Sequence, residues 1–257
     1  MLFDSHLHTE FSADSNMKAE DALAEAEAQG IGLVFTEHID FSYQGEKKFF
    51  FSPEKYWQEY ALLRGENLSL GVELGMVPGE RAMAEDFLSR APFDEIIGSI
   101  HLIDGGDIYE RSIYEGIQKA DMYRKYFRLM AEMVRENPYI DTLAHIDYIA
   151  RYAPYESPGI DYADFEAEID EVLRAVIDTK TALEINTRRF DDRLSIKETA
   201  PILRRYEELG GRFVTIGSDA HRKSAVGFGI KEAASLAKAY GLSVVTFRER
   251  KPVKAGL

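Results

Sequence analysis

Short apolar runs alternate with amphipathic stretches along the chain, and this alternation constrains the fold more than any other feature. Alternating strands and helices predict parallel β/α units rather than a sandwich or a helical bundle. Eight runs are predicted as strands: Leu2–Ser5, Gly32–Thr36, Leu70–Leu74, Glu95–Ile100, Thr142–Ala144, Ala182–Ile185, Phe213–Gly217 and Leu242–Phe247. We therefore expect one α/β barrel domain over residues 1–257, a length that is ordinary for such a barrel.

Helix boundaries between these runs are marked by capping residues, prolines and glycines. Ser52-Pro53 offers an N-cap followed by a first-turn proline. One apolar face extends over 122–134 and ends at Asn137-Pro138, and another extends over 165–177. Ser195 and Glu198 predict a capping box, and Gly210-Gly211 ends the helix that would follow it.

All six histidines lie near the ends of predicted strands, where the chemistry of a β/α barrel is located. A single His-x-His pair, or His145 alone, is more often explained by packing than by metal binding. Six imidazoles accompanied by three carboxylates are hard to explain as packing, and they exceed what one ion can bind. The sequence therefore predicts a multinuclear metal enzyme, with these candidate ligands: His6, His8, Asp14, His38, Glu73, His101, His145, Asp219 and His221.

Composition narrows the classes of partner and compartment. The chain has 31 Lys and Arg against 45 Asp and Glu, a net charge of −14 that argues against nucleic acid. It has no cysteine, which excludes disulfides, thiolate zinc sites and cysteine nucleophiles. No apolar run has membrane-spanning length, and no basic segment followed by an apolar stretch opens the chain. We expect a cytoplasmic protein without a membrane partner.

The order of these residues resembles the polymerase and histidinol phosphatase (PHP) phosphoesterases. The resemblance covers residues 4–221 and implies a distorted TIM-like (β/α)7 barrel with three divalent metal ions in its mouth. Eight strands are predicted and the family implies seven, so whether Leu242–Phe247 belongs to the barrel is left open. The motifs are His6-Leu7-His8, Thr36-Glu37-His38, Gly71-Val72-Glu73, the single His101 and His145, and Ser218-Asp219-Ala220-His221.

The resemblance also implies how the ligands divide among the ions. The first ion would be bound by His6, His8, Glu73 and Asp219, and the second by Glu73, His101 and His145. The third would be bound by Asp14, His38 and His221. Many relatives have histidine in place of Asp14, and its harder oxygen favours manganese or iron over zinc. Asp14 could instead cap the following helix. Zinc, manganese and iron all remain open.

The expected reaction is hydrolysis by a metal-bridging hydroxide, attacking phosphorus in line with the leaving alkoxide. Glu73, Asp219, His101 and His145 would form its catalytic core. Glu37, Asp40 and Asp147 either orient imidazoles or transfer a proton, or are ordinary loop carboxylates.

Phosphate recognition favours arginine, whose planar group matches two oxygens. Arg188 is the first candidate, and each candidate could instead be solvated. The segment Asp104–Gly116 forms either a flap over the mouth or a surface loop. The other three candidates are Arg151, Arg189 and Arg222.

The layout between His101 and His145 and the segment Leu183–Thr187 are similar to the histidinol-phosphate phosphatase branch. This similarity implies hydrolysis of L-histidinol phosphate to L-histidinol and phosphate.

Three alternative functions remain. The first is another substrate, such as a nucleotide, a nucleic-acid end or a different small phosphoester. The second is a metal-dependent amidohydrolase, in which a carbamylated lysine often stands where this chain has Glu73. The third is a non-catalytic binding or regulatory barrel. The oligomeric state is left open.

Overall fold

The computed structural model describes residues 1–256, and its centre is a sheet of seven consecutive parallel strands. Each strand pairs in parallel with the next one along the chain, as expected for repeated β/α units. All eight predicted strands are present at or within a few residues of their predicted positions. The seven parallel strands are β1 (Phe3–Leu7), β2 (Gly32–Ile39), β3 (Leu68–Gly75), β4 (Glu95–Ser99), β7 (Thr142–Leu143), β8 (Ala182–Asn186) and β9 (Phe213–Gly217).

The two edges of this parallel sheet meet at the carboxyl ends of the strands. Leu7 at the end of β1 forms a parallel bridge with Ala220, which follows β9. The His8 amide donates to the Ala220 carbonyl at 2.9 Å, and the Asp219 amide donates to the His6 carbonyl at 2.7 Å. The arrangement is a distorted TIM-like barrel, and these contacts bring β1 and β9 together at the rim that carries the histidines.

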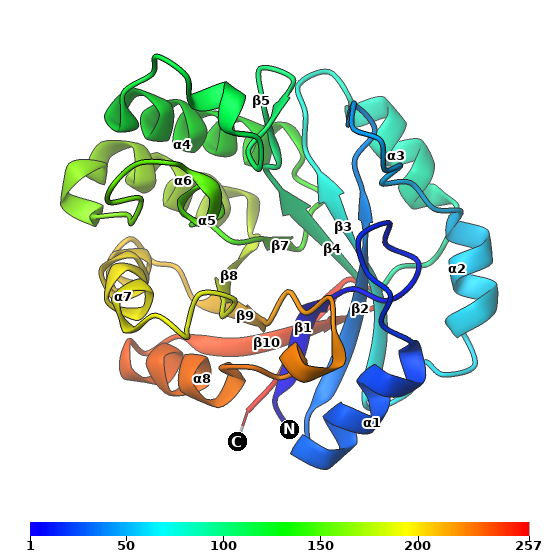
Figure 1. Cartoon of the computed structure of the whole chain (residues 1–257). Coiled ribbons are helices and arrows are strands. Elements are labelled where there is room, and N and C mark those ends of the chain that lie inside the picture. Colours follow the sequence, from blue (N-terminus) through cyan, green and yellow to red (C-terminus); the bar gives the residue numbers. More distant parts are fainter. Residues whose placement is uncertain (257) are drawn as a thin grey trace.

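Helices surround the strands on the outside (Figure 1). The apolar face predicted over 122–134 belongs to the longest of them, α4, and it packs against α6. Within residues 1–256, none of these helices combines the length and apolarity needed to cross a bilayer. The α-helices are α1 (Ala19–Gln29), α2 (Pro53–Tyr60), α3 (Arg81–Ser89), α4 (Lys119–Glu136), α5 (Ile149–Tyr152), α6 (Glu166–Thr179), α7 (Arg193–Glu208) and α8 (Ile230–Ala239), and short 3-10 turns lie at Arg111–Tyr114, Tyr162–Asp164 and Lys223–Ala225.

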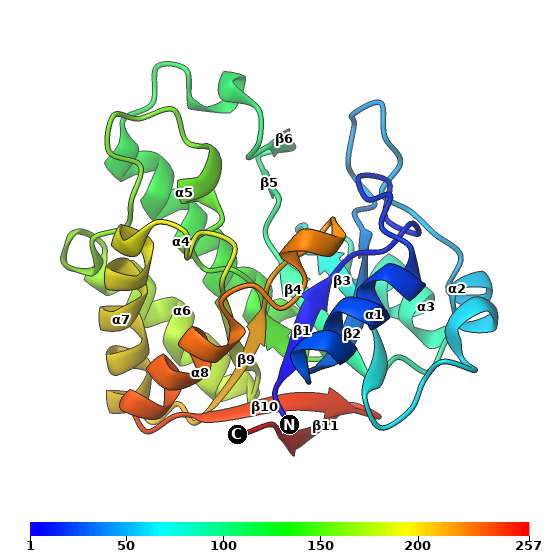
Figure 2. The same cartoon turned by 60° about the horizontal axis from the view of Figure 1, so that its bottom comes forward.

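The last two strands lie across the amino ends of the barrel strands (Figure 2). β10 (Ser243–Arg248) pairs in parallel with β9 through Ser243 and Val244 alone, then leaves it and pairs antiparallel with β11 (Lys251–Lys254). The Arg248 guanidinium reaches the Leu68 carbonyl at 3.2 Å, at the start of β3. The predicted strand Leu242–Phe247 therefore exists, but it covers the end of the seven-stranded barrel instead of joining its wall.

One predicted helix start is wrong and another is confirmed. The capping box at Ser195 and Glu198 does not form, because α7 already begins at Arg193 and Asp192 caps it by accepting from the Leu194 amide at 2.8 Å. Ser52 does cap α2, accepting from the Lys55 amide at 3.3 Å. An aspartate three residues upstream of Ser195 offers an equally good cap, and the sequence pattern alone does not rank the two.

Candidate metal centre

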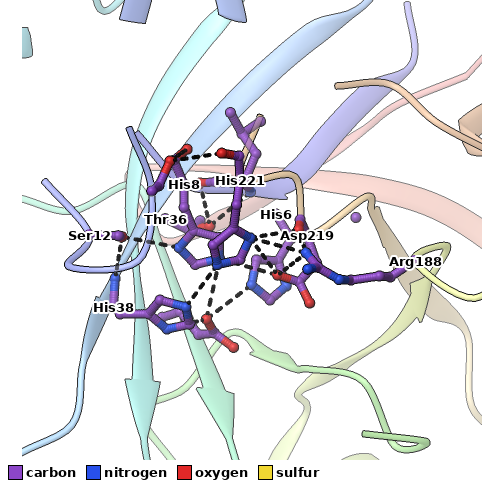
Figure 3. Close-up of polar contacts among 12 residues, drawn as sticks. His6, His8, Ser12, Thr36, His38, Arg188, Asp219 and His221 are labelled. Carbon is purple, nitrogen blue, oxygen red and sulfur yellow. Dashed lines mark hydrogen bonds and ion pairs between the residues drawn. The ribbon is translucent and has the colours of Figure 1, made fainter. Parts of the chain in front are cut away.

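The strand ends bring all six histidines to one side of the barrel, as the sequence predicts. Most of them are buried, which is unusual for imidazoles without a ligand or a fixed partner. Figure 3 shows His6, His8, His38, Asp219 and His221 pointing toward a common centre from segments far apart in the chain. The set comes from β1 (His6) and the residue after it (His8), β2 (His38), β3 (Glu73), and the segments after β4 (His101), β7 (His145) and β9 (Asp219, His221).

Glu73 lies at the middle of this cluster and is fully buried. Its carboxylate oxygens lie 2.8 to 3.4 Å from nitrogens of five imidazoles. Burial would raise the pKa of Glu73, but the imidazoles around it, those of His6, His38 and His101 foremost, hold that pKa well below its ordinary value. An ionised carboxylate with two oxygens facing different histidines has the geometry of a bridging ligand. The five imidazoles are those of His6, His8, His38, His101 and His145.

Several of these atoms have no hydrogen-bond partner although they are buried. They include His6 Nε2, His8 Nε2, His38 Nδ1 and Glu73 Oε2, counted over the part of the chain that the structure describes. His6 Nδ1 lies 2.7 Å from Glu184 and donates to it in the neutral tautomer, which leaves a lone pair on Nε2 that faces Glu73 Oε2 at 3.2 Å. Two lone pairs aimed at each other are unfavourable unless a cation lies between them. The donor set therefore fits divalent metal ions.

Three groups of three side chains keep their ligand atoms within 4.8 Å of one another. They share His8, His38 and Glu73, so the groups overlap and form one continuous cluster. These groups differ in part from the ligand sets that the family resemblance implies. His38 lies with Glu73 and His101, where the resemblance implies His145, and His8 lies with His38 and His221, where it implies Asp14. The groups are His6, His8 and Glu73; His38, Glu73 and His101; and His8, His38 and His221.

Asp219 connects the cluster to two of the candidate arginines. Its carboxylate pairs with Arg151 and lies 3.4 Å from His8 Nε2, while the Arg188 guanidinium donates to its backbone carbonyl. Burial would raise the pKa of Asp219, but Arg151 and His8 hold it well below its ordinary value. Asp219 also has a φ of 55°, a left-handed conformation that the backbone contact to His6 fixes. The strained residue is therefore part of the site itself.

Asp14 lies at the outer side of the cluster, with 28% of its side chain exposed. Its Oδ2 is 3.1 Å from His221 Nε2 and 3.7 Å from His38 Nε2. The alternative in which Asp14 caps the following helix is wrong, because α1 begins at Ala19 and its N-cap residue is Lys18. His221 Nδ1 lies 2.9 Å from the Asp219 carbonyl and can donate to it, which leaves Nε2 free to face Asp14.

The four candidate arginines have different environments. Arg151 is buried, since 6% of its side chain is exposed, and its second nitrogen donates to Asn186 at 2.7 Å. Arg189 instead pairs with Asp147 at 3.0 Å and Glu198 at 3.1 Å, so its guanidinium is already neutralised by two carboxylates. Arg188 has 39% of its side chain exposed and lies 3.1 Å from His221 Nδ1. Arg188 and Arg222 line the same cavity, of about 530 Å³, beside His221.

Carboxylates behind the histidines fix the orientation of the imidazole rings. Asp40 lies 3.0 Å from His101 Nδ1, so it orients an imidazole as one of its two expected roles predicts. Among the residues that the structure describes, Glu37 contacts no imidazole nitrogen directly and acts on His8 through Ser12. It accepts a hydrogen bond from the Ser12 hydroxyl, whose oxygen lies 3.2 Å from His8 Nδ1. The remaining expected carboxylate, Asp147, makes its ion pair with Arg189.

Two further carboxylates that support the site were not identified from the sequence. Glu184 on β8 accepts from His6 Nδ1 and from the His145 amide, each at 2.7 Å. Asp4 accepts from the Ser218 amide at 2.8 Å, its hydroxyl at 2.6 Å and the Gly227 amide at 2.8 Å, and so fixes the segment that carries Asp219. Each stands inside a strand motif that also carries ordinary core residues. A charged residue within an apolar strand run is the signal that could have identified both.

The mouth is bordered by a small hairpin and several tyrosines. Directly after His101, β5 (Leu102–Ile103) pairs antiparallel with β6 (Gly106–Asp107), which lies within the segment Asp104–Gly116. Tyr148 contacts the His101 and His145 rings at centroid distances of 5.1 and 4.7 Å, and it also contacts Tyr152. Tyr109, which is 62% exposed, packs edge-on against Tyr152 at 5.1 Å. Aromatic rings therefore extend from the histidines to the rim.

Comparison with known proteins places this site in a family. The model of the PHP domain matches residues 4–188. The chain belongs to the PHP domain family. It is 43% identical over 250 residues to a probable histidinol-phosphatase from Clostridium acetobutylicum, and the match covers 97% of this chain and 98% of that protein. It is 34% identical over 250 residues to a histidinol-phosphatase from Lactococcus lactis subsp. lactis, with 93% and 91% of the two chains covered.

A solved structure is similar over nearly the whole chain. It is the crystal structure of a histidinol phosphate phosphatase from Lactococcus lactis subsp. lactis, in complex with zinc, L-histidinol and phosphate. The two chains superpose with a TM-score of 0.93 at 32% sequence identity, and the match covers 98% of this chain and 99% of the other. The PHP barrel fold that the sequence motifs imply is therefore confirmed.

Proposed function

We propose that this chain hydrolyses L-histidinol phosphate to L-histidinol and inorganic phosphate. The observation that carries the proposal is the buried cluster around Glu73, in which one carboxylate faces five imidazoles and unpaired acceptor atoms face each other. Two relatives named as histidinol-phosphatases, one of them 43% identical, support the choice of substrate. The chain lacks cysteine, so a cysteinyl-phosphate route is excluded.

We further propose that the cluster binds three divalent ions, which can be zinc, manganese or iron. His6, His8, Glu73 and Asp219 would hold the first, and Glu73 would share the second with His101 and His145. Asp14, His38 and His221 would hold the third, whose mixed nitrogen and oxygen set suits all three metals. When bound, such ions lower the pKa of water and neutralise charge on a phosphoryl group.

The residues of the chain around the ions have positioning roles. Glu184 and Asp40 hold His6 and His101 so that each presents its other nitrogen to the centre. Arg151 holds Asp219, because its guanidinium pairs with that carboxylate and with Asn186. Arg151 is therefore a weaker candidate for direct contact with substrate than its position in the sequence suggests.

Arg188 would bind the phosphate group of the substrate, and Arg222 would make the second contact. Both line the cavity of about 530 Å³ beside His221, and Arg188 remains partly exposed there. Arg189 has both sides of its guanidinium occupied by Asp147 and Glu198, so it supports the loop after β8. The remaining half of the substrate, an imidazole and an ammonium group, would extend toward the tyrosines of the rim. Asp107 on β6 offers a half-buried carboxylate there for the ammonium group.

A substrate panel tests the proposal. The metal-loaded protein is assayed for phosphate release from L-histidinol phosphate, p-nitrophenyl phosphate, several sugar phosphates and nucleoside monophosphates. We expect kcat/KM for histidinol phosphate to exceed the others by at least about a hundredfold, the worth of two good polar contacts. Equal rates across the panel would leave a general phosphoesterase, and a preference for nucleotides would remove the histidinol assignment.

We propose that the chain works as one barrel domain over residues 1–257 on a small molecule. The nine-stranded sheet continues from β1 to β11, beyond the residues that the family model matches. The net charge of −14 disfavours the phosphate backbone of nucleic acid as a competing partner.

A further inference from the structure

A second cavity, of about 520 Å³, lies at the end of the barrel opposite the histidines. Its walls include Asp141, Thr181 and Arg212, which immediately precede β7, β8 and β9. Its floor includes Phe247 of β10 and Arg250 of the β10–β11 turn, the strands that cross this end in Figure 2. The metal centre uses the carboxyl ends of the same strands, so this cavity is separate from it. Its volume is in the range of small-molecule sites.

The charges around this cavity are positive, in contrast to the chain as a whole. Lys180 and Arg212 are exposed, and within residues 1–256 neither makes an ion pair or a side-chain hydrogen bond. Asp141 is the one carboxylate among the lining residues, and it is occupied by Arg250 and by the Ile96 amide at 2.8 Å. Two free cations beside one cavity favour an anionic ligand, in a protein whose overall net charge is −14.

The rest of the lining is aromatic and held in place. Tyr139, Tyr206, Phe213 and Phe247 all contribute to the wall. The Tyr206 hydroxyl donates to the Phe213 carbonyl at 3.2 Å, and the Tyr139 hydroxyl donates to Asn137 at 2.7 Å, so both tyrosine rings have fixed orientations. Phe213 is 42% exposed although it begins a barrel strand. Aromatic faces beside cations fit a flat ring that carries an acidic group.

Two of the cationic side chains are held on unfavourable backbone. Lys180 has a φ of 62° and Arg250 a φ of 63°, in the left-handed region where glycine would be free of strain. Arg250 is fixed there because its amide donates to the Asp94 carbonyl at 3.0 Å and its guanidinium pairs with Asp141. A turn alone would be satisfied by glycine at either position. The pair with Asp141 accounts for the side chain of Arg250, whereas the Lys180 side chain makes no ion pair or hydrogen bond within residues 1–256.

We propose that this cavity is a second ligand site, which binds a small organic anion with a flat aromatic body. Lys180 and Arg212 bind the anionic group, and the aromatic wall contacts the ring. The site is independent of the phosphatase reaction, since its residues lie at the amino ends of the strands and none belongs to the metal cluster.

The test uses the fluorescent anion 8-anilinonaphthalene-1-sulfonate and the full-length, metal-loaded protein. Saturating inorganic phosphate is present to occupy the metal centre. We expect the dye to bind under these conditions, and we expect the double substitution Lys180→Glu with Arg212→Glu to weaken binding at least about tenfold, equivalent to about 1.4 kcal/mol. Phe213→Ser should weaken binding as well, through the aromatic half of the site.

The matched control is Lys231→Glu, the same charge change at an exposed position of α8 outside the cavity. It should leave dye affinity within about twofold of wild type, a change well below the tenfold effect predicted above. Retained phosphatase activity shows that each variant is folded. Equal affinity in the double variant and wild type would overturn the proposal. Dye binding that the double variant retains and that phosphate abolishes would overturn it too, because the dye would then occupy the metal centre.

Discussion

Replacing Glu184 by glutamine should weaken metal binding without unfolding the barrel. The Glu184 carboxylate accepts from three donors: His6 Nδ1 at 2.7 Å, the His145 amide at 2.7 Å and the Asn186 side chain at 3.0 Å. A glutamine of the same size has one acceptor oxygen and one NH2 group, so at least one of these donors would face another donor. A buried donor left without an acceptor costs about 1–3 kcal/mol.

The effect on the metal follows from the same contacts. Loss of an orienting partner behind a metal-bound histidine typically costs about 10- to 100-fold in metal affinity, or about 1.4–2.8 kcal/mol. We expect a drop of this size for the ion that we propose His6 binds, measured by competition with a chelator and elemental analysis. Glu168→Gln, at a buried glutamate that pairs with Arg128 far from the site, is the control. Metal affinity in Glu184→Gln within twofold of wild type would refute the positioning role.

Three further predictions concern single residues. Glu73→Gln should reduce turnover by more than about a hundredfold, which exceeds the loss expected when a residue that only orients a metal ligand is replaced. The circular dichroism spectrum of this variant should match that of wild type. Arg188→Ala should raise KM for every phosphomonoester by about tenfold or more, the worth of a charged hydrogen bond, without reordering the panel. Burial raises the pKa of Glu95 from 4.5 to about 8, so the folded protein retains a proton that the unfolded chain releases, and stability should fall as pH rises between these values by about 1.4 kcal/mol per unit. Glu95→Gln cannot ionise, and denaturant unfolding at pH 5 and pH 9 should show that it has lost this dependence.

The sequence predicts the positions of the strands and the convergence of the histidines, because both depend on the order of short motifs along the chain. An apolar run followed by histidine places the ring at a strand end, and parallel strands bring those ends together. The chain order of β/α units then fixes which strands are neighbours. For this reason His8 and His221, which are far apart in the sequence, could be expected in one cluster. In the structure their ring centroids are 4.3 Å apart.

The supporting contacts could not be predicted in the same way. Glu184 and Asp4 act through partners that are distant in the sequence, and no spacing rule connects them. The roles of the arginines depend on which carboxylate lies opposite, as the pairing of Arg189 with Asp147 illustrates. The start of α7 depends on a choice between two competent caps, Asp192 and Ser195. For the carboxylates and the arginines, the deciding energy comes from tertiary contacts of about 1 kcal/mol or more rather than from local propensity.

A titration of the metal-free protein tests the central claim most directly. Phosphate release from L-histidinol phosphate is measured while zinc, manganese or iron is added in known ratio to the chain, and bound metal is counted in the same samples. Nine candidate ligands, with Glu73 proposed to bridge two ions, predict that activity rises to its maximum as bound metal approaches three ions per chain. Full activity at one ion per chain, or no phosphate release with three ions bound, would contradict the account.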